Sequence, residues 1–189
     1  MTDTTARTEP RAAAIRLIRA TALDEAAHHG GSGLPPANWE MYQELTATLE
    51  SWYADGALAE DSLLLTEWLA TELVAYVLQM LDQDRERLAR WLLDQGDRVC
   101  QTQQHPHPAG PTAVEIISVI AASIGVPDQP AERLVQIAVP YLSYLRPGHE
   151  VEDAREVALT FALWAGENLA RLMAYEADRV DGYLADRAG

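Results

Sequence analysis

The sequence predicts an all-α protein, an irregular bundle of six to eight helices without significant β-structure. Through most of the chain, apolar residues recur every three or four positions, as they do along one face of a helix. No stretch alternates apolar and polar residues between turn-forming residues, as a half-buried strand would. The 189 residues, 48% hydrophobic and 23% charged, are enough for one well-packed core and few for two. We therefore expect a single helical domain.

The first part of the chain is rich in arginine and ends in a glycine- and proline-rich break. Residues 1–9 are polar and predict a disordered tail. A first helix is expected over 10–29, because Pro10 suits the first turn of a helix. Residues 30–36 predict a linker that detaches this helix from the rest of the chain. The arginines of this part form a candidate partner surface: Arg7, Arg11, Arg16 and Arg19.

Residues 37–104 predict acidic helices. Between Arg19 and Arg85 the chain has twelve acidic residues and no basic one. This block is expected either to pair with the basic first helix or to be a solvated face. Periodicity leaves open whether 58–104 is one helix or two, and the polar run that begins at Asp82 favours a break there.

Residues 111–187 predict the apolar helices of the core. Thr112 and Glu115 have the spacing of a capping box, in which each side chain bonds the backbone of the other at a helix start. Pro140 is expected to kink or split its helix. The last helix is expected to run over 150–187.

The charge of the chain excludes several classes of function. The net charge is −15, and a field of that sign repels nucleic acids. All fourteen basic residues are arginine, which is typical of GC-rich bacterial genomes and leaves no lysine for a Schiff base or a phosphate-binding loop. No uninterrupted apolar run approaches the ~20 residues of a membrane span, and no signal peptide is recognisable. We expect a cytoplasmic protein that binds neither nucleic acid nor membrane.

Metal-binding patterns are weak, and neither a metal nor another cofactor is expected. A di-iron bundle needs two Glu-x-x-His motifs, whereas Glu25 and His28 form the only one here. Cys100, His105 and His107 lie close in sequence, but the prolines between them make the run stiff and no fourth ligand is evident. We assign no catalytic residue.

Several large aromatic and acidic side chains lie within the apolar helices and are candidates for lining a ligand pocket. Buried polar groups need partners, and perturbed carboxylates mark functional sites. Glu167 has Arg171 four residues later, which predicts an ion pair within the helix. The candidates are Trp68, Glu72, Tyr76, Trp91, Glu115, Tyr141, Tyr144, Trp164 and Glu167.

Three functions fit these features. The first is a non-catalytic interaction or regulatory protein that associates with itself, as a homodimer, or with another protein. The second is a helical sensor that binds a small apolar ligand in an aromatic-lined pocket. The third is a small all-α enzyme that uses buried carboxylates, for which Glu72, Glu115 and Glu167 are the positions to inspect.

Overall fold

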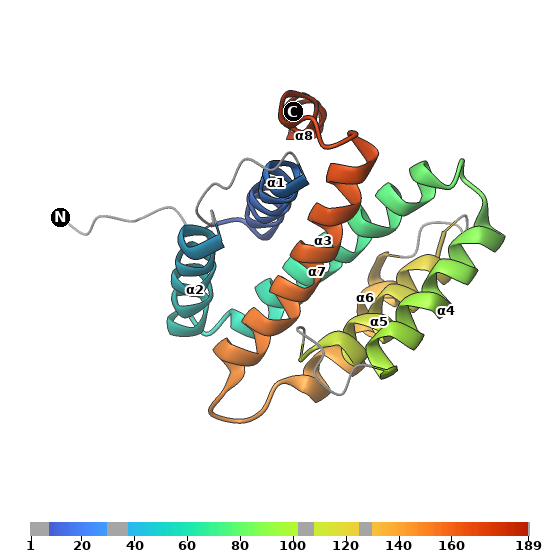
Figure 1. The fold of residues 1–189 in the computed structure, drawn as a ribbon. Helices are drawn as coiled ribbons and strands as arrows, with labels where there is room; N and C mark the ends of the chain where they lie inside the picture. Colours follow the sequence, from blue (N-terminus) through green and yellow to red (C-terminus); the bar gives the residue numbers. More distant parts are fainter. Residues whose placement is uncertain (1–7, 30–37, 102–107, 125–129, 189) are drawn as a thin grey trace.

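The fold is a bundle of helices. The computed structural model describes residues 8–29, 38–101, 108–124 and 130–188, and within them it has eight helices and no strand, which confirms the predicted all-α class (Figure 1). In chain order the helices are α1 (Pro10–His29), α2 (Asn38–Ala54), α3 (Leu58–Met80), α4 (Arg85–Gln101), α5 (Gly110–Ala122), α6 (Pro130–Tyr144), α7 (Glu150–Leu172) and α8 (Ala177–Ala188).

Helices α3 and α7 pack against each other at the centre of the bundle (Figure 1). Leucine or valine stands at every fourth position of α3, and this spacing turns one continuous apolar stripe toward the core, as the sequence predicts. On α7, Val157 and Phe161 are fully buried, and the Phe161 ring meets that of Trp164 edge to face at 6.3 Å between centroids. The core therefore lies where these two long helices meet, and not only in the C-terminal half of the chain.

Helix α3 is long and apolar enough to cross a membrane, judged by length and composition alone, and it is the single such helix in the described part of the chain. However, 56% of its most apolar window is buried inside the bundle. A central helix of a protein core has the same properties, because it is covered by its neighbours.

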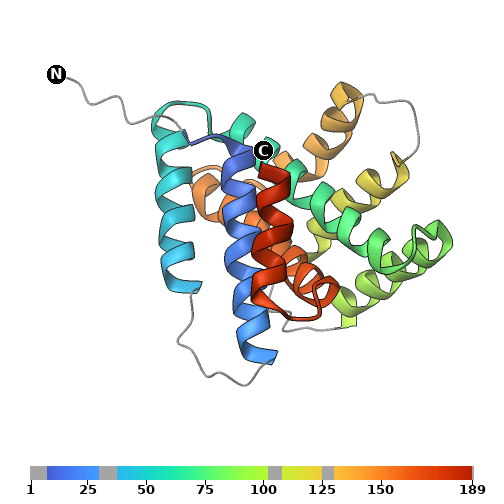
Figure 2. The ribbon, with the colours of Figure 1, turned by 90° about the horizontal axis from the view of Figure 1, so that it is seen from above.

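The other helices form two groups on either side of the central pair (Figure 2). Helices α1, α2 and α8 lie on one side, with α1 between the other two. Helices α4, α5 and α6 lie on the opposite side, with α5 between α4 and α6. Each group thus covers one flank of the α3–α7 pair.

Helix α1 is part of the core, so the expectation that it is detached from the rest of the chain is wrong, while residues 30–36 themselves lie outside the described residues. It packs closely on α7 and also contacts α2, α3 and α8. Its inner face has small residues, and the buried Thr21 hydroxyl donates a hydrogen bond to the Ala162 carbonyl oxygen of α7 at 2.8 Å. Gly166 of α7 lies directly beside Thr21. The two helices approach closely because neither presents a large side chain at the crossing.

The described part of the stretch 58–104, which ends at residue 101, contains two helices, and the expected break near Asp82 is confirmed. Helix α3 ends where Asp82 and Gln83 adopt the left-handed conformation, with φ of 54° and 63°. The Gln83 amide donates to the Leu78 carbonyl oxygen at 2.8 Å, which closes the helix end. Two successive residues with side chains in this conformation are strained.

Gln83→Gly is therefore expected to stabilise the protein by about 0.5–1 kcal/mol, because glycine adopts a positive φ without steric cost. Urea unfolding followed by circular dichroism measures the change. The control is Arg90→Gly, at an exposed position inside α4, which should cost about 1 kcal/mol. A loss of stability in Gln83→Gly would contradict the strain at this turn.

The expectation of one helix over 150–187 is wrong, since α7 ends at Leu172 and α8 begins at Ala177. Ala174 and Tyr175 have φ of 56° and 60°, and the chain reverses there. The Tyr175 ring stacks on His29 at 3.7 Å between centroids, which ties the reversal to the end of α1. Helix α8 consequently folds back along α1 instead of extending away from the bundle.

One further helix boundary differs from expectation. Helix α5 begins at Gly110, and no side chain caps it, so the capping box at Thr112 and Glu115 does not form. Pro111 in the first turn accounts for the earlier start, because its missing N–H costs nothing there. Helix α6 runs through Pro140 without being split.

Candidate functional site

Three of the residues proposed from the sequence to line a ligand pocket lie on one face of α3. Trp68, Glu72 and Tyr76 are spaced by four, which places their side chains one above another. They face a cavity enclosed by α1, α3 and α8. This cavity, called here the α1–α3–α8 cavity, has a volume of about 200 Å³.

The wall of the α1–α3–α8 cavity is mostly apolar, and its polar groups come from α3 and from the outer ends of α1 and α8. The lining side chains are Arg11, Ala14, Ile15 and Ile18 of α1, Trp68, Glu72 and Tyr76 of α3, and Leu184 and Arg187 of α8. An apolar wall with a few converging polar groups is the usual construction of a small-molecule site.

A polar network fixes α8 against α3 at one side of the cavity. Arg187 Nη2 lies 3.2 Å from Glu72 Oε1, and Arg187 Nη1 donates to the Tyr183 hydroxyl at 2.5 Å. Gln79 Nε2 of α3 donates to the same hydroxyl at 2.9 Å. Arg187 and Glu72 thereby neutralise each other, although both remain within the cavity lining.

Arg11 closes another part of the cavity rim. Its guanidinium lies over the Trp68 ring at 5.2 Å from the centroid, and its Nη2 donates to the Arg187 carbonyl oxygen at 2.8 Å. The first helix and the last are thus joined beside the cavity. A cation over an indole face contributes roughly 0.5–1 kcal/mol where it is exposed.

Two polar atoms that belong to residues of the cavity lining have no hydrogen bond of ordinary geometry to any described residue. They are the Tyr76 hydroxyl and Glu72 Oε2, and both atoms are buried. The Tyr76 side chain is fully buried, and this burial raises the pKa of Tyr76 well above its usual range, together with the charge of the Glu72 carboxylate, which the hydroxyl approaches closely. The hydroxyl therefore stays protonated and can donate. A buried unpaired polar group costs about 1–3 kcal/mol, which a suitable partner would recover.

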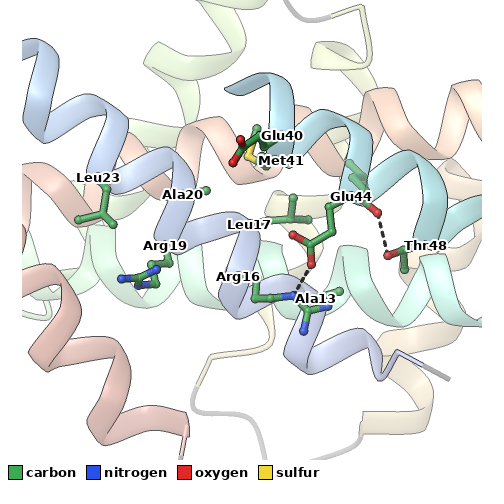
Figure 3. A pocket seen from close by; sticks show the side chains of 11 residues that line it. Ala13, Arg16, Leu17, Arg19, Ala20, Leu23, Glu40, Met41, Glu44 and Thr48 are labelled. Carbon is green, nitrogen blue, oxygen red and sulfur yellow. Dashed lines mark hydrogen bonds and ion pairs between the residues drawn. The ribbon is translucent and has the colours of Figure 1, made fainter. Parts of the chain in front are cut away.

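A second hollow lies on the other flank of α1, in the groove between α1 and α2 (Figure 3). Its volume is about 250 Å³, and Leu17, Leu23 and Met41 contribute to its apolar lining. Arg16 Nε pairs with Glu44 Oε1 at its edge, at 2.7 Å. Within the described residues, none of the buried unpaired polar atoms belongs to this lining. The groove therefore offers a ligand no buried polar atom that needs a hydrogen-bond partner, in contrast to the α1–α3–α8 cavity.

The other tyrosines and tryptophans proposed for a pocket lie elsewhere. Trp91 is half-buried on α4. Tyr141 is buried on α6, and its hydroxyl, close to those of Ser62 and Thr66, makes no hydrogen bond of ordinary geometry to the described residues. The Tyr144 hydroxyl donates to Glu156 at 2.6 Å. None of these three side chains lines the α1–α3–α8 cavity together with Trp68.

The remaining proposed positions lie within the core or at the surface. Trp164 is buried against Phe161 in the core. Glu115 is exposed on α5. Glu167 forms the predicted ion pair with Arg171, at 2.7 Å. Of the three carboxylates to inspect, Glu72 alone lines the α1–α3–α8 cavity.

The arginines proposed as a partner surface make contacts within the chain. Arg16 pairs with Glu44 of the acidic block, and Arg19 makes two hydrogen bonds to Asp181 of α8, at 2.8 and 3.2 Å. Arg11 belongs to the cavity rim. Arg7 lies outside the described residues.

Potential metal ligands do not gather in the part of the chain that the structure describes, where no three His, Cys, Asp or Glu side chains come together. His105 and His107 lie outside that part, and Cys100 is exposed at the end of α4. The lone motif of Glu25 and His28 lies on α1, where burial raises the pKa of Glu25.

The α1–α3–α8 cavity is therefore the site with the most specific chemistry among the described residues. It combines an apolar wall, a neutralised ion pair, and a buried hydroxyl and carboxylate oxygen that make no hydrogen bond of ordinary geometry to the described residues. No family model, no curated protein and no solved structure matches this chain.

Proposed function

We propose that this protein is a helical ligand-binding protein, a sensor whose small ligand occupies the α1–α3–α8 cavity. The observation that carries the proposal is the pair of unpaired buried atoms, the Tyr76 hydroxyl and Glu72 Oε2. Buried polar groups in folded proteins nearly always have a partner. The Tyr76 hydroxyl and the Glu72 carboxylate lie close to each other, on residues that line one cavity, and a ligand group that enters between them would pair both.

The two atoms define the polar end of the ligand. Tyr76 donates, since it stays protonated, and Glu72 Oε2 accepts. A hydroxyl or a primary amide offers both an acceptor and a donor within one small group. The apolar wall favours a hydrocarbon body, and Trp68 offers it a flat surface. The ligand class is an uncharged, one-ring or short-chain alcohol or amide, since about 150 Å³ already admits benzene.

Ligand binding would also strengthen the attachment of α8. The cavity is lined jointly by α3 and α8, and their polar link is the network of Glu72, Tyr183 and Arg187. A molecule seated between these helices stabilises the arrangement in which α8 is docked, by mass action. Occupancy of the cavity thereby controls how firmly the last helix is held, and this is the signal that we assign to the sensor.

The first test compares two ring compounds of nearly equal size. Phenol has a hydroxyl and toluene has a methyl group in its place. We expect phenol to bind the wild-type protein about tenfold more tightly than toluene, since one hydrogen bond to a charged group contributes about 1.5–3 kcal/mol. Isothermal titration calorimetry measures both affinities. Equal affinity for the two compounds, or no binding of phenol at millimolar concentration, would overturn the proposal.

Tyr76→Phe separates ligand recognition from stability. The variant should lose most of the preference for phenol, and it should gain about 1 kcal/mol of stability in urea, since it removes an unpaired buried hydroxyl. Tyr141→Phe is the matched control, because that hydroxyl is also buried and unpaired but lies outside the cavity. It should leave phenol binding unchanged. If Tyr76→Phe destabilises the protein and leaves phenol binding intact, the hydroxyl serves the fold through Glu72.

A second candidate function is self-association, the interaction role expected from the sequence. A specific observation favours it, the exposed apolar face of α6. It is compatible with ligand binding, since α6 does not contribute to the α1–α3–α8 cavity.

A further inference from the structure

One face of α6 exposes large apolar side chains to solvent. Val135 and Val139 are 68% and 67% exposed, and Leu142 is 48% exposed. Their spacing of four and three places them in one stripe along the helix. We call this stripe the α6 face. A contiguous apolar patch on a soluble protein commonly marks an interaction site.

The opposite side of α6 is firmly bound, so the α6 face cannot turn inward. Ile137 and Tyr141 are fully buried. Arg133 donates two hydrogen bonds to Glu67 Oε1 of α3, from Nε at 2.9 Å and from Nη2 at 2.6 Å. These contacts hold the helix at a fixed rotation, with the α6 face outward.

Helix α6 has few charged residues compared with the chain as a whole. The chain has a net charge of −15, which makes two copies repel each other over most of their surface. Helix α6 has only two charged residues, Glu132 and Arg133, and Arg133 is tied to Glu67. The exposed neighbours of the stripe, Gln136 and Ser143, are neutral. Two α6 helices that approach each other therefore bring few like charges together.

We propose that the α6 face binds the same face of a second copy of this chain, with the two α6 helices antiparallel about a two-fold axis at Val139. In this arrangement Val135 lies against the partner's Leu142, and Val139 lies against its own copy. Glu132, near the start of α6, comes next to the partner's Arg146, just beyond the end of α6.

Charge selects the antiparallel arrangement over the parallel one. A parallel pair would place Glu132 beside its own copy, whereas the antiparallel pair places it beside an arginine. The Arg146 side chain is 65% exposed, and its ion pair with the buried Asp153 holds it in place, so Glu132 would meet its exposed part without further ordering. The opposite ends of the helix dipoles also come together in the antiparallel pair.

The dimer is expected to be weak. One pair of short helices buries less than the roughly 1,200 Å² of a standard specific interface, and we expect a dissociation constant on the order of tens of micromolar or weaker, as for transient complexes. Sedimentation equilibrium of the full chain from about 5 to 500 µM should therefore show a monomer–dimer transition. A monomer throughout this range would overturn the proposal.

Variants locate the interface. Val139→Glu should abolish dimerisation, since it places two carboxylates together at the two-fold axis. Leu93→Glu is the matched control, because Leu93 is an equally exposed apolar residue, 70% exposed, on α4. Circular dichroism and the melting temperature verify that both variants fold. Dimerisation that survives Val139→Glu, or is lost equally in Leu93→Glu, would contradict the α6 interface.

Cross-linking tests the two-fold axis even when the dimer is a minor species, because a disulfide traps it. In a Cys100→Ser background, which removes the single cysteine, Val139→Cys should form an intermolecular disulfide under mild oxidation. Leu93→Cys in the same background should do so at least tenfold more slowly. Equal rates for the two variants would show random collision and reject the axis at Val139. This test is independent of ligand binding and can fail without affecting that proposal.

Discussion

Gly166→Ala is expected to destabilise the protein by about 3 kcal/mol, the largest effect of any single-methyl change that we predict. A Cβ at this position of α7 would lie 2.1 Å from Thr21 Oγ1, 2.5 Å from Thr21 Cβ and 2.8 Å from the Ala22 backbone nitrogen. The methyl group cannot be accommodated unless α1 moves away from α7, and α1 is held by several other helices. Urea unfolding followed by circular dichroism measures the loss.

The control is Gly182→Ala in α8, where an added Cβ meets nothing within 4 Å. This variant should gain about 0.5–1 kcal/mol, because alanine favours the helix over glycine. The opposite signs of two identical substitutions would separate helix propensity from packing. If Gly166→Ala were as stable as the wild type, the close crossing of α1 and α7 would be refuted.

A double variant tests which atoms cause the clash. Thr21→Ala removes the hydroxyl that lies nearest to the added methyl group, but the Cβ of residue 21 and the Ala22 nitrogen remain in place. Thr21→Ala combined with Gly166→Ala should therefore recover only part of the lost stability. Full recovery would mean that the Thr21 hydroxyl alone causes the clash with the added methyl group.

Asp153→Asn is expected to lower the melting temperature by several degrees, with an effect that depends on pH. The Asp153 side chain is fully buried, and it accepts hydrogen bonds from the Arg146 backbone nitrogen at 2.6 Å and from Arg146 Nη2 at 2.5 Å. These bonds connect the α6–α7 turn to the first turn of α7. Asparagine keeps the shape of the side chain but loses the charge that Arg146 binds.

The pH dependence results from the lowered pKa of Asp153. Hydrogen bonds from the Arg146 side chain are the main cause, and they stabilise the ionised carboxylate in the folded state. A carboxyl group with a folded pKa below its unfolded value of about 3.9 contributes full stability above that value. The contribution is lost as the pH falls through the folded pKa.

Thermal unfolding of the wild type and of Asp153→Asn, from pH 7 to pH 2.5, measures this contribution. The gap between the two melting temperatures should be constant above about pH 5 and should narrow below about pH 4. Glu167→Gln is the control, because Glu167 pairs with Arg171 on the surface and such pairs contribute little. A gap for Asp153→Asn that stayed constant down to pH 2.5 would refute the role of the carboxylate charge.

The sequence predicts the helices well because their signals are local. The four-residue stripe of α3 and the break at Asp82 both depend on residues within a few positions of each other. The reversal at Tyr175 is not predictable in this way. Neither Ala174 nor Tyr175 is typical of a left-handed turn, and the stacking of Tyr175 on His29 comes from a residue far away in sequence.

The candidate site is predictable on α3 and not on its neighbours. Trp68, Glu72 and Tyr76 share a helix face, and their spacing shows it. Arg187 joins them only because α8 folds back, which a single helix over 150–187 would not allow. The sequence places Arg11 on a partner surface for a similar reason, since residues 30–36 are expected to separate its helix from the bundle. Contacts between segments that are distant in sequence determine the positions of both Arg187 and Arg11, and local sequence patterns do not reveal such contacts.

The position of α1 also determines when this protein can fold. Helix α1 is synthesised before the helix on which it packs most closely, since α7 begins 121 residues after α1 ends, from His29 to Glu150. At about 5–20 residues per second, a ribosome takes on the order of ten seconds to make that stretch. During this interval the small apolar face around Ile18 lacks the α7 surface that covers it in the finished fold. Folding of the core therefore waits until α7 has been made, and chaperone dependence should concentrate on α1.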